Sequence, residues 1–277
     1  MKLAYSSLAC PGWTVEEASD AVTRYGFDGI EWRLADGEPI TSQTPESVLR
    51  RVIEATRSHR LSVPALDSSC QLVQADAASR SATMREGERM VTLASNLGAP
   101  AVRVFGGPLP DGASLDEALT PAAEVLRAIA RYAAPHGIHI LLETHDSAWS
   151  RSANALALME AAGEPNVGIL YDVLHPCRLG ESVEQTLSTL GRLIELVHVK
   201  DGHRPPDGSE VWPLCALGEG DVPLDRILSM LYAQRYDGWY TFEWEKRWHP
   251  ELAGPEMALP AGAAFVRALA ASVSAAP

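Results

Sequence analysis

The stretch Gly137-Ile-His-Ile-Leu-Leu-Glu-Thr-His-Asp146 raises the question on which the fold of this chain turns. Four of the six residues from 138 to 143 are isoleucine or leucine, a density typical of a buried strand. The strand nevertheless ends in Glu143, and His145 follows two residues later. Because a buried charge is very unfavourable unless it is paired, this end of the strand either faces water or binds a cation.

A short apolar run followed by a longer amphipathic segment recurs along the whole chain. The predicted strands are Leu3–Tyr5, Gly29–Trp32, Leu61–Leu66, Ala101–Phe105, Ile138–Leu142, Val167–Tyr171, Leu196–Val199 and Trp239–Phe242. The predicted helices include Val15–Tyr25, Pro45–Ser58, Arg85–Leu97, Leu115–Ala134, Glu181–Arg192 and Leu224–Gln234. Nearly continuous apolar strands are typical of a parallel sheet covered on both faces. Their alternation with helices predicts an α/β protein, a (β/α)8 TIM barrel that forms a single domain over residues 1–277.

Composition excludes several classes of protein. Apolar residues make up 46% of the chain and charged residues 21%, which is enough for a large core. The formal net charge of −13 argues against binding to nucleic acid or to anionic membranes. The first residues do not form a signal peptide, and no apolar run is expected to span a membrane. The four cysteines are scattered, so we expect reduced thiols in a cytoplasmic protein.

Ligand-type residues follow four successive predicted strands. In a barrel, the carboxyl ends of the strands form the active-site face, so we expect Glu143, Asp172, His198 and Glu243 to converge there. Three converging carboxylates repel one another unless a cation compensates them. A set of carboxylate oxygens with one imidazole suits Mn²⁺, Mg²⁺, Co²⁺ or Fe²⁺, and Zn²⁺ is also compatible with it. The sequence therefore predicts one divalent metal ion.

Five motifs in a fixed order carry a resemblance to a known family. They are Leu141–Asp146 (LLETHD), Tyr171–Pro176 (YDVLHP), Val197–Asp201 (VHVKD), Leu217–Asp221 (LGEGD) and Thr241–Lys246 (TFEWEK). Over essentially the whole chain, this pattern resembles the xylose isomerase-like TIM barrel superfamily, also called the sugar phosphate isomerase/epimerase family. Its members include ketose 3-epimerases and inosose isomerases and dehydratases.

The resemblance implies a function and roles for several residues. Glu143, Asp172, His198 and Glu243 match the metal ligands, Glu143 and Glu243 also match the proton-transfer residues, and His175 matches a substrate contact. The expected activity is a divalent-metal-dependent isomerase or epimerase of carbohydrate metabolism. It would act on a keto-sugar or cyclitol through a metal-bound enediolate. The alternatives are a dehydratase of the inosose or dehydroshikimate type and a non-catalytic sugar-binding barrel.

Further polar and aromatic residues near the strand ends are candidate substrate contacts. Besides His175, they are Arg103, Lys200, His145, Glu219 and Trp32. For Arg103, an ion pair with Glu31 is an equally good interpretation, and Lys200 has Asp201 as an alternative partner. There is no glycine-rich phosphate-binding loop near strands seven and eight, which favours an unphosphorylated sugar, cyclitol or small hydroxy-keto acid.

A DNA-repair endonuclease branch of the same superfamily does not fit this chain. Those enzymes carry extra metal ligands where this sequence has Gly106-Gly107 and Trp212-Pro213-Leu214. The expected partner is therefore a small sugar or cyclitol, and the family resemblance implies a homodimer or homotetramer.

Overall fold

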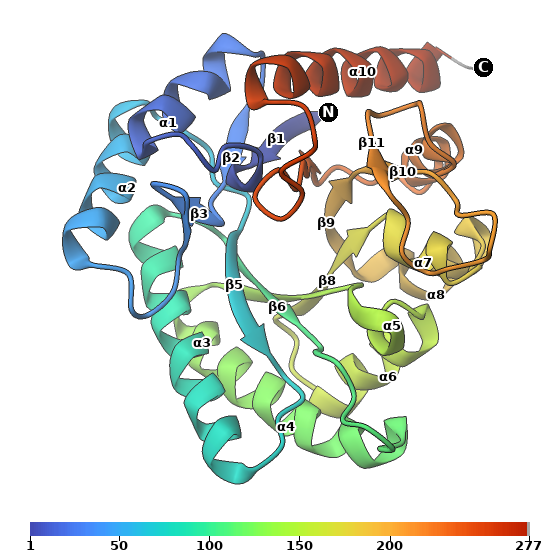
Figure 1. Ribbon diagram of the computed structural model, residues 1–277. Coiled ribbons are helices and arrows are strands. Elements are labelled where there is room, and N and C mark those ends of the chain that lie inside the picture. The colour runs from blue at the N-terminus through green and yellow to red at the C-terminus, as the bar shows by residue number, and fades with distance from the viewer. Residues whose placement is uncertain (276–277) are drawn as a thin grey trace.

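Parallel strands form the inner wall of a barrel in the computed structural model, which describes residues 1–275 (Figure 1). These strands are β1 (Lys2–Ser6), β2 (Gly29–Glu31), β5 (Leu66–Gln71), β6 (Ala101–Phe105), β7 (His139–Glu143), β8 (Val167–Asp172), β9 (Ile194–Val199) and β12 (Trp239–Phe242). Their order in the sheet is β2-β1-β12-β9-β8-β7-β6-β5. Parallel bridges from Gly29 to Ser62 and from Trp32 to Leu66 join the two edges. The predicted (β/α)8 barrel is confirmed.

Helices surround the barrel on its outside (Figure 1). They are α1 (Val15–Arg24), α2 (Glu46–Ser58), α3 (Ala77–Leu97), α4 (Leu115–Ala133), α5 (Asp146–Trp149), α6 (Ser152–Ala162), α7 (Leu174–Arg178), α8 (Val183–Leu190), α9 (Leu224–Ala233) and α10 (Pro255–Ala275). Short 3₁₀ segments lie at Ser7–Ala9 (η1), Ala134–His136 (η2) and Gly191–Leu193 (η3). Two antiparallel pairs, β3 (Leu34–Ala35) with β4 (Glu38–Pro39) and β10 (Asp201–Gly202) with β11 (Leu214–Cys215), form in the loops.

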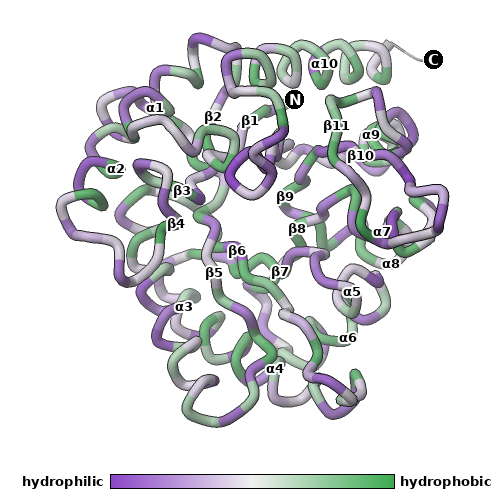
Figure 2. Tube along the Cα trace, viewed as in Figure 1, coloured by the Kyte–Doolittle hydropathy of each residue, from purple (hydrophilic) through white to green (hydrophobic). Residues whose placement is uncertain are grey.

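Local sequence signals set several helix ends. Thr14 accepts a hydrogen bond from the Glu17 backbone while the Glu17 side chain accepts one from the Thr14 backbone, a capping box that starts α1. Gly98 ends α3 with φ 73°, a left-handed conformation that glycine adopts without steric cost. The amphipathic helices mix hydrophilic and hydrophobic residues along their length (Figure 2). Their apolar faces therefore pack on the sheet, and their polar faces meet solvent.

Each barrel strand presents two different faces. One set of alternate residues, such as Tyr5, Val102 and Ile140, belongs to the large hydrophobic cluster that the strands share with the helices. The other set, which includes Leu141, Leu170 and Leu196, forms a separate small cluster inside the barrel. Side chains alternate along a strand, so a residue two positions further along lies on the same face. Glu143, Asp172 and His198 follow Leu141, Leu170 and Leu196 by two residues and therefore also face the inside of the barrel.

Two predicted boundaries were wrong. The third strand was expected at Leu61–Leu66 but runs from Leu66 to Gln71, and Ser62 only makes the isolated bridge to β2. The helix expected at Arg85–Leu97 begins at Ala77, because Asp76 caps it by accepting a hydrogen bond from the Ser79 backbone. The first error concerns the strand that carries Asp67 at the inner face of the barrel.

The last helix also corrects an expectation about hydropathy. Within α10, the segment Pro255–Ser274 is long and apolar enough to cross a membrane by length and composition alone, although no such segment was expected. Its buried residues include Leu259 and Val266, which belong to the core shared with the barrel. Because 28% of this window is buried, contact with the barrel accounts for only part of its apolar composition.

Candidate metal centre and mouth pocket

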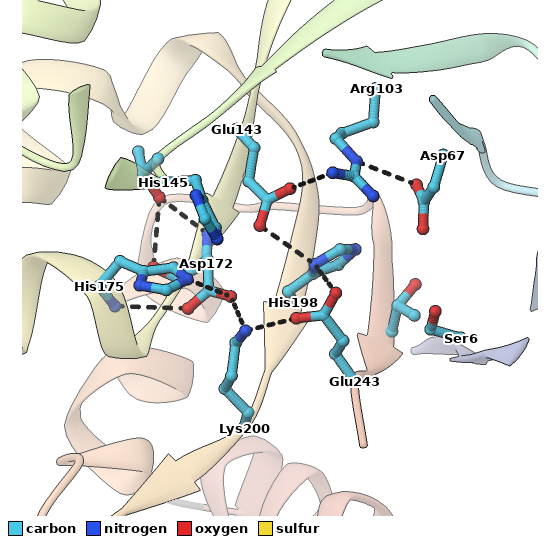
Figure 3. A network of polar contacts seen from close by, with 12 residues as sticks. Ser6, Asp67, Arg103, Glu143, His145, Asp172, His175, His198, Lys200 and Glu243 are labelled. Atoms are coloured by element: carbon cyan, nitrogen blue, oxygen red, sulfur yellow. Dashed lines mark hydrogen bonds and ion pairs between the residues drawn. The ribbon is translucent and has the colours of Figure 1, made fainter. Parts of the chain in front are cut away.

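Four side chains from four neighbouring strands meet inside the carboxyl end of the barrel (Figure 3). We call Glu143, Asp172, His198 and Glu243 the ligand set. Glu143 and Asp172 end β7 and β8, His198 lies in β9, and Glu243 directly follows β12. All four side chains are buried, and one potential ligand atom of each lies within 4.8 Å of those of the others. The convergence expected from the sequence is therefore present.

The donor atoms of the ligand set fit a divalent cation. Glu143 Oε2, Asp172 Oδ2, His198 Nδ1 and Glu243 Oε2 are buried without a hydrogen-bond partner among the described residues. His198 Nδ1 lies 3.2 Å from Glu243 Oε1 and 3.8 Å from Glu143 Oε1, so the imidazole points into the carboxylates (Figure 3). Buried polar atoms normally have partners, and three oxygens with one nitrogen form a donor set that Mn²⁺, Co²⁺, Fe²⁺ or Zn²⁺ accepts.

The other nitrogen of His198 is fixed by residues that were not expected to act together. Its Nε2 lies 2.6 Å from Glu31 Oε1, and Thr241 Oγ1 donates to Glu31 Oε2 at 2.7 Å. A carboxylate on the far nitrogen of a metal-binding histidine holds the tautomer that leaves the near nitrogen free. Here Glu31 therefore keeps Nδ1 of His198 directed at the ligand set.

Arg103 does not pair with Glu31, which was one of its two expected roles. Its guanidinium lies 3.6 Å from Asp67 Oδ1 and 3.3 Å from Glu143 Oε2 (Figure 3). Asp67 was not among the candidates, although it directly follows a predicted strand, as the three carboxylates of the ligand set do. Burial and the neighbouring Glu31 raise the pKa of Asp67 well above its usual range, while Arg103 acts against this rise. Arg103 thus positions Glu143 from the side opposite the other ligands.

Electrostatics keep most of the ligand set in defined charge states. Burial alone would raise the pKa of Glu243, but His198 and Lys200 hold it well below its usual range. Burial alone would lower the pKa of His198, but Glu243 and Glu31 raise it well above. Burial raises the pKa of Asp172 to about 6, with Lys200 limiting the rise. At neutral pH, Asp172 and Glu243 are therefore carboxylates that can bind a cation.

Lys200 lies inside the carboxylate cluster rather than beside Asp201. Its Nζ is 2.8 Å from Asp172 Oδ2 and 2.5 Å from Glu243 Oε2, and it donates to Glu245 Oε1 at 2.5 Å. Burial would lower the pKa of Lys200, but these carboxylates raise it well above its usual value. The ammonium group is therefore a fixed positive charge at the edge of the ligand set. Asp201 instead accepts hydrogen bonds from the backbone of residues 218–222 and shapes that loop.

Two histidines lie on the β7–β8 side of the ligand set (Figure 3). His175 is buried, with Nε2 3.6 Å from Asp172 Oδ2, and burial lowers its pKa well below the usual range. His145 is partly exposed at the rim, its ring 4.5 Å from that of His175 between centroids. Asp146 outweighs burial and raises the pKa of His145. His145 lines the pocket at the barrel mouth, whereas His175 lies buried behind it against Asp172.

Two candidate substrate contacts lie elsewhere. Trp32 is fully buried, and its Nε1 donates to Thr56 Oγ1 of α2 at 3.1 Å. Because Glu31 points into the barrel, the next residue points out of it. Trp32 is therefore a packing residue, and its candidacy was wrong. Glu219 is exposed on the loop after β11 and is not among the residues that line the pocket at the barrel mouth.

A pocket of about 80 Å³ opens above the ligand set, and we call it the mouth pocket. It is lined by Leu8, Arg33, Arg103, Phe105, Glu143, His145, Lys200, Glu243, Glu245 and Trp248. Arg33 was not among the predicted site residues, although it follows Glu31 by two and so shares its side of the strand. The pocket combines charged groups with the apolar side chains of Leu8, Phe105 and Trp248.

Comparison with known proteins agrees with this geometry. An inosose isomerase from Bacillus velezensis is 27% identical over 218 residues, which cover 75% of each chain. The crystal structure of the IolI protein with a bound zinc atom superposes with a TM-score of 0.85 at 20% identity over 100% of both chains. An L-ribulose 3-epimerase gives a TM-score of 0.82 at 19% identity, covering 99% of this chain and 96% of the other. Residues 19–269 match the family model, and the chain belongs to the xylose isomerase-like TIM barrel family.

Proposed function

We propose that this chain is a divalent-metal-dependent isomerase or epimerase of a keto-sugar or cyclitol. The observation that carries the proposal is the ligand set, whose buried donor atoms lie within 4.8 Å of one another and place three carboxylates around one imidazole. The inosose isomerase relative and the structural likeness to an epimerase support this reaction class. The zinc in the IolI protein supports a divalent ion, and Mn²⁺, Mg²⁺, Co²⁺ and Fe²⁺ suit the same donors.

The four members of the ligand set would hold the ion. When bound, the ion supplies Lewis acidity that polarises a substrate carbonyl and acidifies the neighbouring C–H bond. Lys200, held at 2.5 Å from Glu243 and 2.8 Å from Asp172, adds a positive charge beside the oxygen on which negative charge develops. Leu8, Phe105 and Trp248 offer an apolar wall to the C–H face of the substrate.

Glu143 and Glu243 are the proposed proton-transfer residues. They come from β7 and β12, which are separated by β8 and β9, so they approach the pocket from different sides. His198 and Lys200 hold the pKa of Glu243 low against the effect of burial, so Glu243 is ionised and can accept a proton at neutral pH. Glu243 would take the proton from the carbon next to the carbonyl. Glu143 would return a proton to the opposite face, which gives an epimer, or to the adjacent carbon, which gives an isomer.

Dehydration is the second candidate reaction, and His145 favours it. The first proton abstraction is the same, but loss of a β-hydroxyl needs an acid at the leaving oxygen. Asp146 outweighs burial and raises the pKa of His145, so this histidine carries a proton closer to neutral pH than an ordinary histidine. It lies at the rim of the mouth pocket, where it could protonate a leaving hydroxyl.

Proton exchange with solvent tests the proposal. The full chain, loaded with Mn²⁺, is incubated in D₂O with a panel of inososes and ketoses and followed by proton NMR. Deuterium at a carbon next to the carbonyl is expected, and its position separates epimerisation from isomerisation. A new ultraviolet chromophore with water loss would indicate the dehydratase. Metal binding without exchange on any member of the panel would contradict the proposed isomerase and favour a sugar-binding barrel.

A further inference from the structure

Arg33 is a buried guanidinium with no partner of its own, in the wall of the mouth pocket. It follows β2 and has an exposed fraction of only 7%. Its backbone N–H donates to Ser7 Oγ at 2.8 Å, and its carbonyl accepts from the Ile40 N–H at 3.0 Å. Hydrogen bonds thus fix both the N–H and the C=O of Arg33, and the fixed backbone positions its side chain in the pocket wall.

The other two cations of the pocket are already matched by carboxylates. Arg103 contacts Asp67 and Glu143, and Lys200 contacts Asp172, Glu243 and Glu245. Among the described residues, no carboxylate lies within ion-pair distance (4.0 Å) of Arg33, and no acceptor hydrogen-bonds its guanidinium. Its Nη1 is buried without a partner.

An unpaired buried guanidinium is unfavourable in an isolated protein. Burial, reinforced by Arg103, lowers the pKa of Arg33 to about 10 against the opposing effect of Asp67, Glu143 and Glu243, so the group is still charged at neutral pH. Leaving a buried charged donor unpaired costs the full desolvation of that group. An incoming anion in the pocket would remove this cost, which makes Arg33 a recognition element rather than a packing element.

We infer that the substrate carries an oxyanion, a carboxylate or a phosphate monoester, that Arg33 binds while the hydroxy-keto part faces the ligand set. This inference rests on the proposed function and names its substrate class: an acidic keto-sugar or cyclitol derivative rather than a neutral one. The planar guanidinium suits both oxyanions, because it donates two parallel hydrogen bonds to either of them. The net charge of −13 is not concentrated in this pocket, where Arg33, Arg103 and Lys200 offset the carboxylates of Glu143, Glu243 and Glu245.

Matched ligands separate the charge of the substrate from its shape. D-fructose, 2-keto-D-gluconate and D-fructose 1-phosphate share their stereochemistry and differ at C1, and D-fructuronate and D-fructose 6-phosphate carry the corresponding groups at C6. Binding of each compound to the Mn²⁺-loaded full chain is measured by calorimetry, and deuterium exchange is measured in parallel. At least one anionic compound is expected to bind at least tenfold more tightly than D-fructose. Whether that compound is an acid or an ester identifies the oxyanion.

Variants assign the preference to Arg33. Arg33→Gln should lower the ratio of anionic to neutral affinity at least tenfold, and Arg33→Lys should keep part of it. Arg226→Gln, on the exposed face of α9 where Arg226 pairs with Glu184, should keep the whole ratio. If Arg33→Gln unfolds, Arg33→Lys decides the question, because a smaller ratio in this variant assigns the preference to the guanidinium and an unchanged ratio contradicts the role of Arg33.

A wild-type protein that binds none of the anions more tightly than D-fructose overturns the inference, as does a preference that survives Arg33→Gln. The two proposals fail in different ways. Deuterium exchange on neutral ketoses without any anion preference would support the isomerase and contradict the role of Arg33. Anion preference without exchange would support the role of Arg33 and contradict the isomerase.

Discussion

The two ends of the barrel interior are built from the same strands but have opposite chemistry. At the amino end, the inward residues are Ala65, Ala101, Leu141, Leu170 and Leu196, with Trp239 packed against them. Two residues later on the same strands come Asp67, Arg103, Glu143, Asp172, His198 and Thr241. Inside the barrel, an apolar layer therefore lies directly below a layer of polar and mostly charged side chains, and the two layers are two residues apart along each strand.

This difference separates stability from chemistry. Burying the apolar layer stabilises the fold, whereas the charged layer is tolerated only because its members compensate one another or bind a cation. Cavity size alone would mislead here. A cavity of about 250 Å³ between α9 and α10 at the amino end, lined by residues such as Tyr232 and Tyr240, is larger than the mouth pocket. It contains none of the ligand set.

Glu243→Gln should have the largest effect, and it acts only at the charged end. Removing the base that His198 and Lys200 hold ionised is expected to lower the rate of solvent deuterium exchange by about 10²–10⁴-fold, the usual contribution of a positioned general base. The exchange rate is followed by proton NMR with Mn²⁺ present. Glu184→Gln, at an exposed position on α8, serves as the control and should keep the rate. Full exchange activity in Glu243→Gln would remove its catalytic role.

Leu170→Ala should have the next largest effect, and it acts only at the apolar end. Leu170 is fully buried, and its truncation is expected to lower the free energy of unfolding by about 2–5 kcal/mol through lost burial and a residual cavity. Urea denaturation of the metal-free chain measures this change. The folded variant should bind Mn²⁺ as the wild type does. A loss of metal affinity with unchanged stability would show that the two layers are not separable.

Glu31→Gln tests how the charged layer positions one of its own metal ligands. Glu31 holds His198 through Nε2, so its loss is expected to weaken metal binding by about 10–100-fold. Competition titration with a chelator measures the affinity, and the visible spectrum of the Co²⁺-loaded chain reports the geometry of the site. Glu16→Gln, which alters an exposed ion pair with Arg51, is the control. An unchanged affinity together with an unchanged cobalt spectrum would show that Glu31 does not position His198.

The smallest expected effect is a pH dependence of metal affinity. Burial raises the pKa of Asp172 to about 6, so the carboxylate is present above this pH and is protonated below it. Because protons compete with the cation, affinity should fall about tenfold for each pH unit below this pKa. Above it, affinity should still rise with pH, because the raised pKa of His198 means that this ligand also has to release a proton. Calorimetric titration with Mn²⁺ across this range tests the sign. Affinity that rises on acidification would contradict this assignment.

Periodicity and strand endings were enough to predict the barrel and the ligand set. Apolar runs alternating with capped amphipathic segments indicate βα units, and barrel geometry requires that their carboxyl ends face one mouth. The convergence of the ligand set could therefore be predicted from the sequence, because it depends only on where each strand ends. Strand limits were less certain, since the strand predicted at Leu61–Leu66 runs from Leu66 to Gln71.

Side-chain direction and pairing were decided only by the tertiary structure. Trp32 adjoins Glu31 in sequence, yet it packs outward against Thr56, while Arg103 pairs with Asp67 and Glu143 instead of Glu31. Closure of the barrel through bridges between β2 and the β5 segment set these relations. The sequence by itself determined which residue types reach the mouth, because that follows from local periodicity. The ion pairs that form, and the lack of one at Arg33 among the described residues, depend on distances between strands. No local sequence pattern contains these distances.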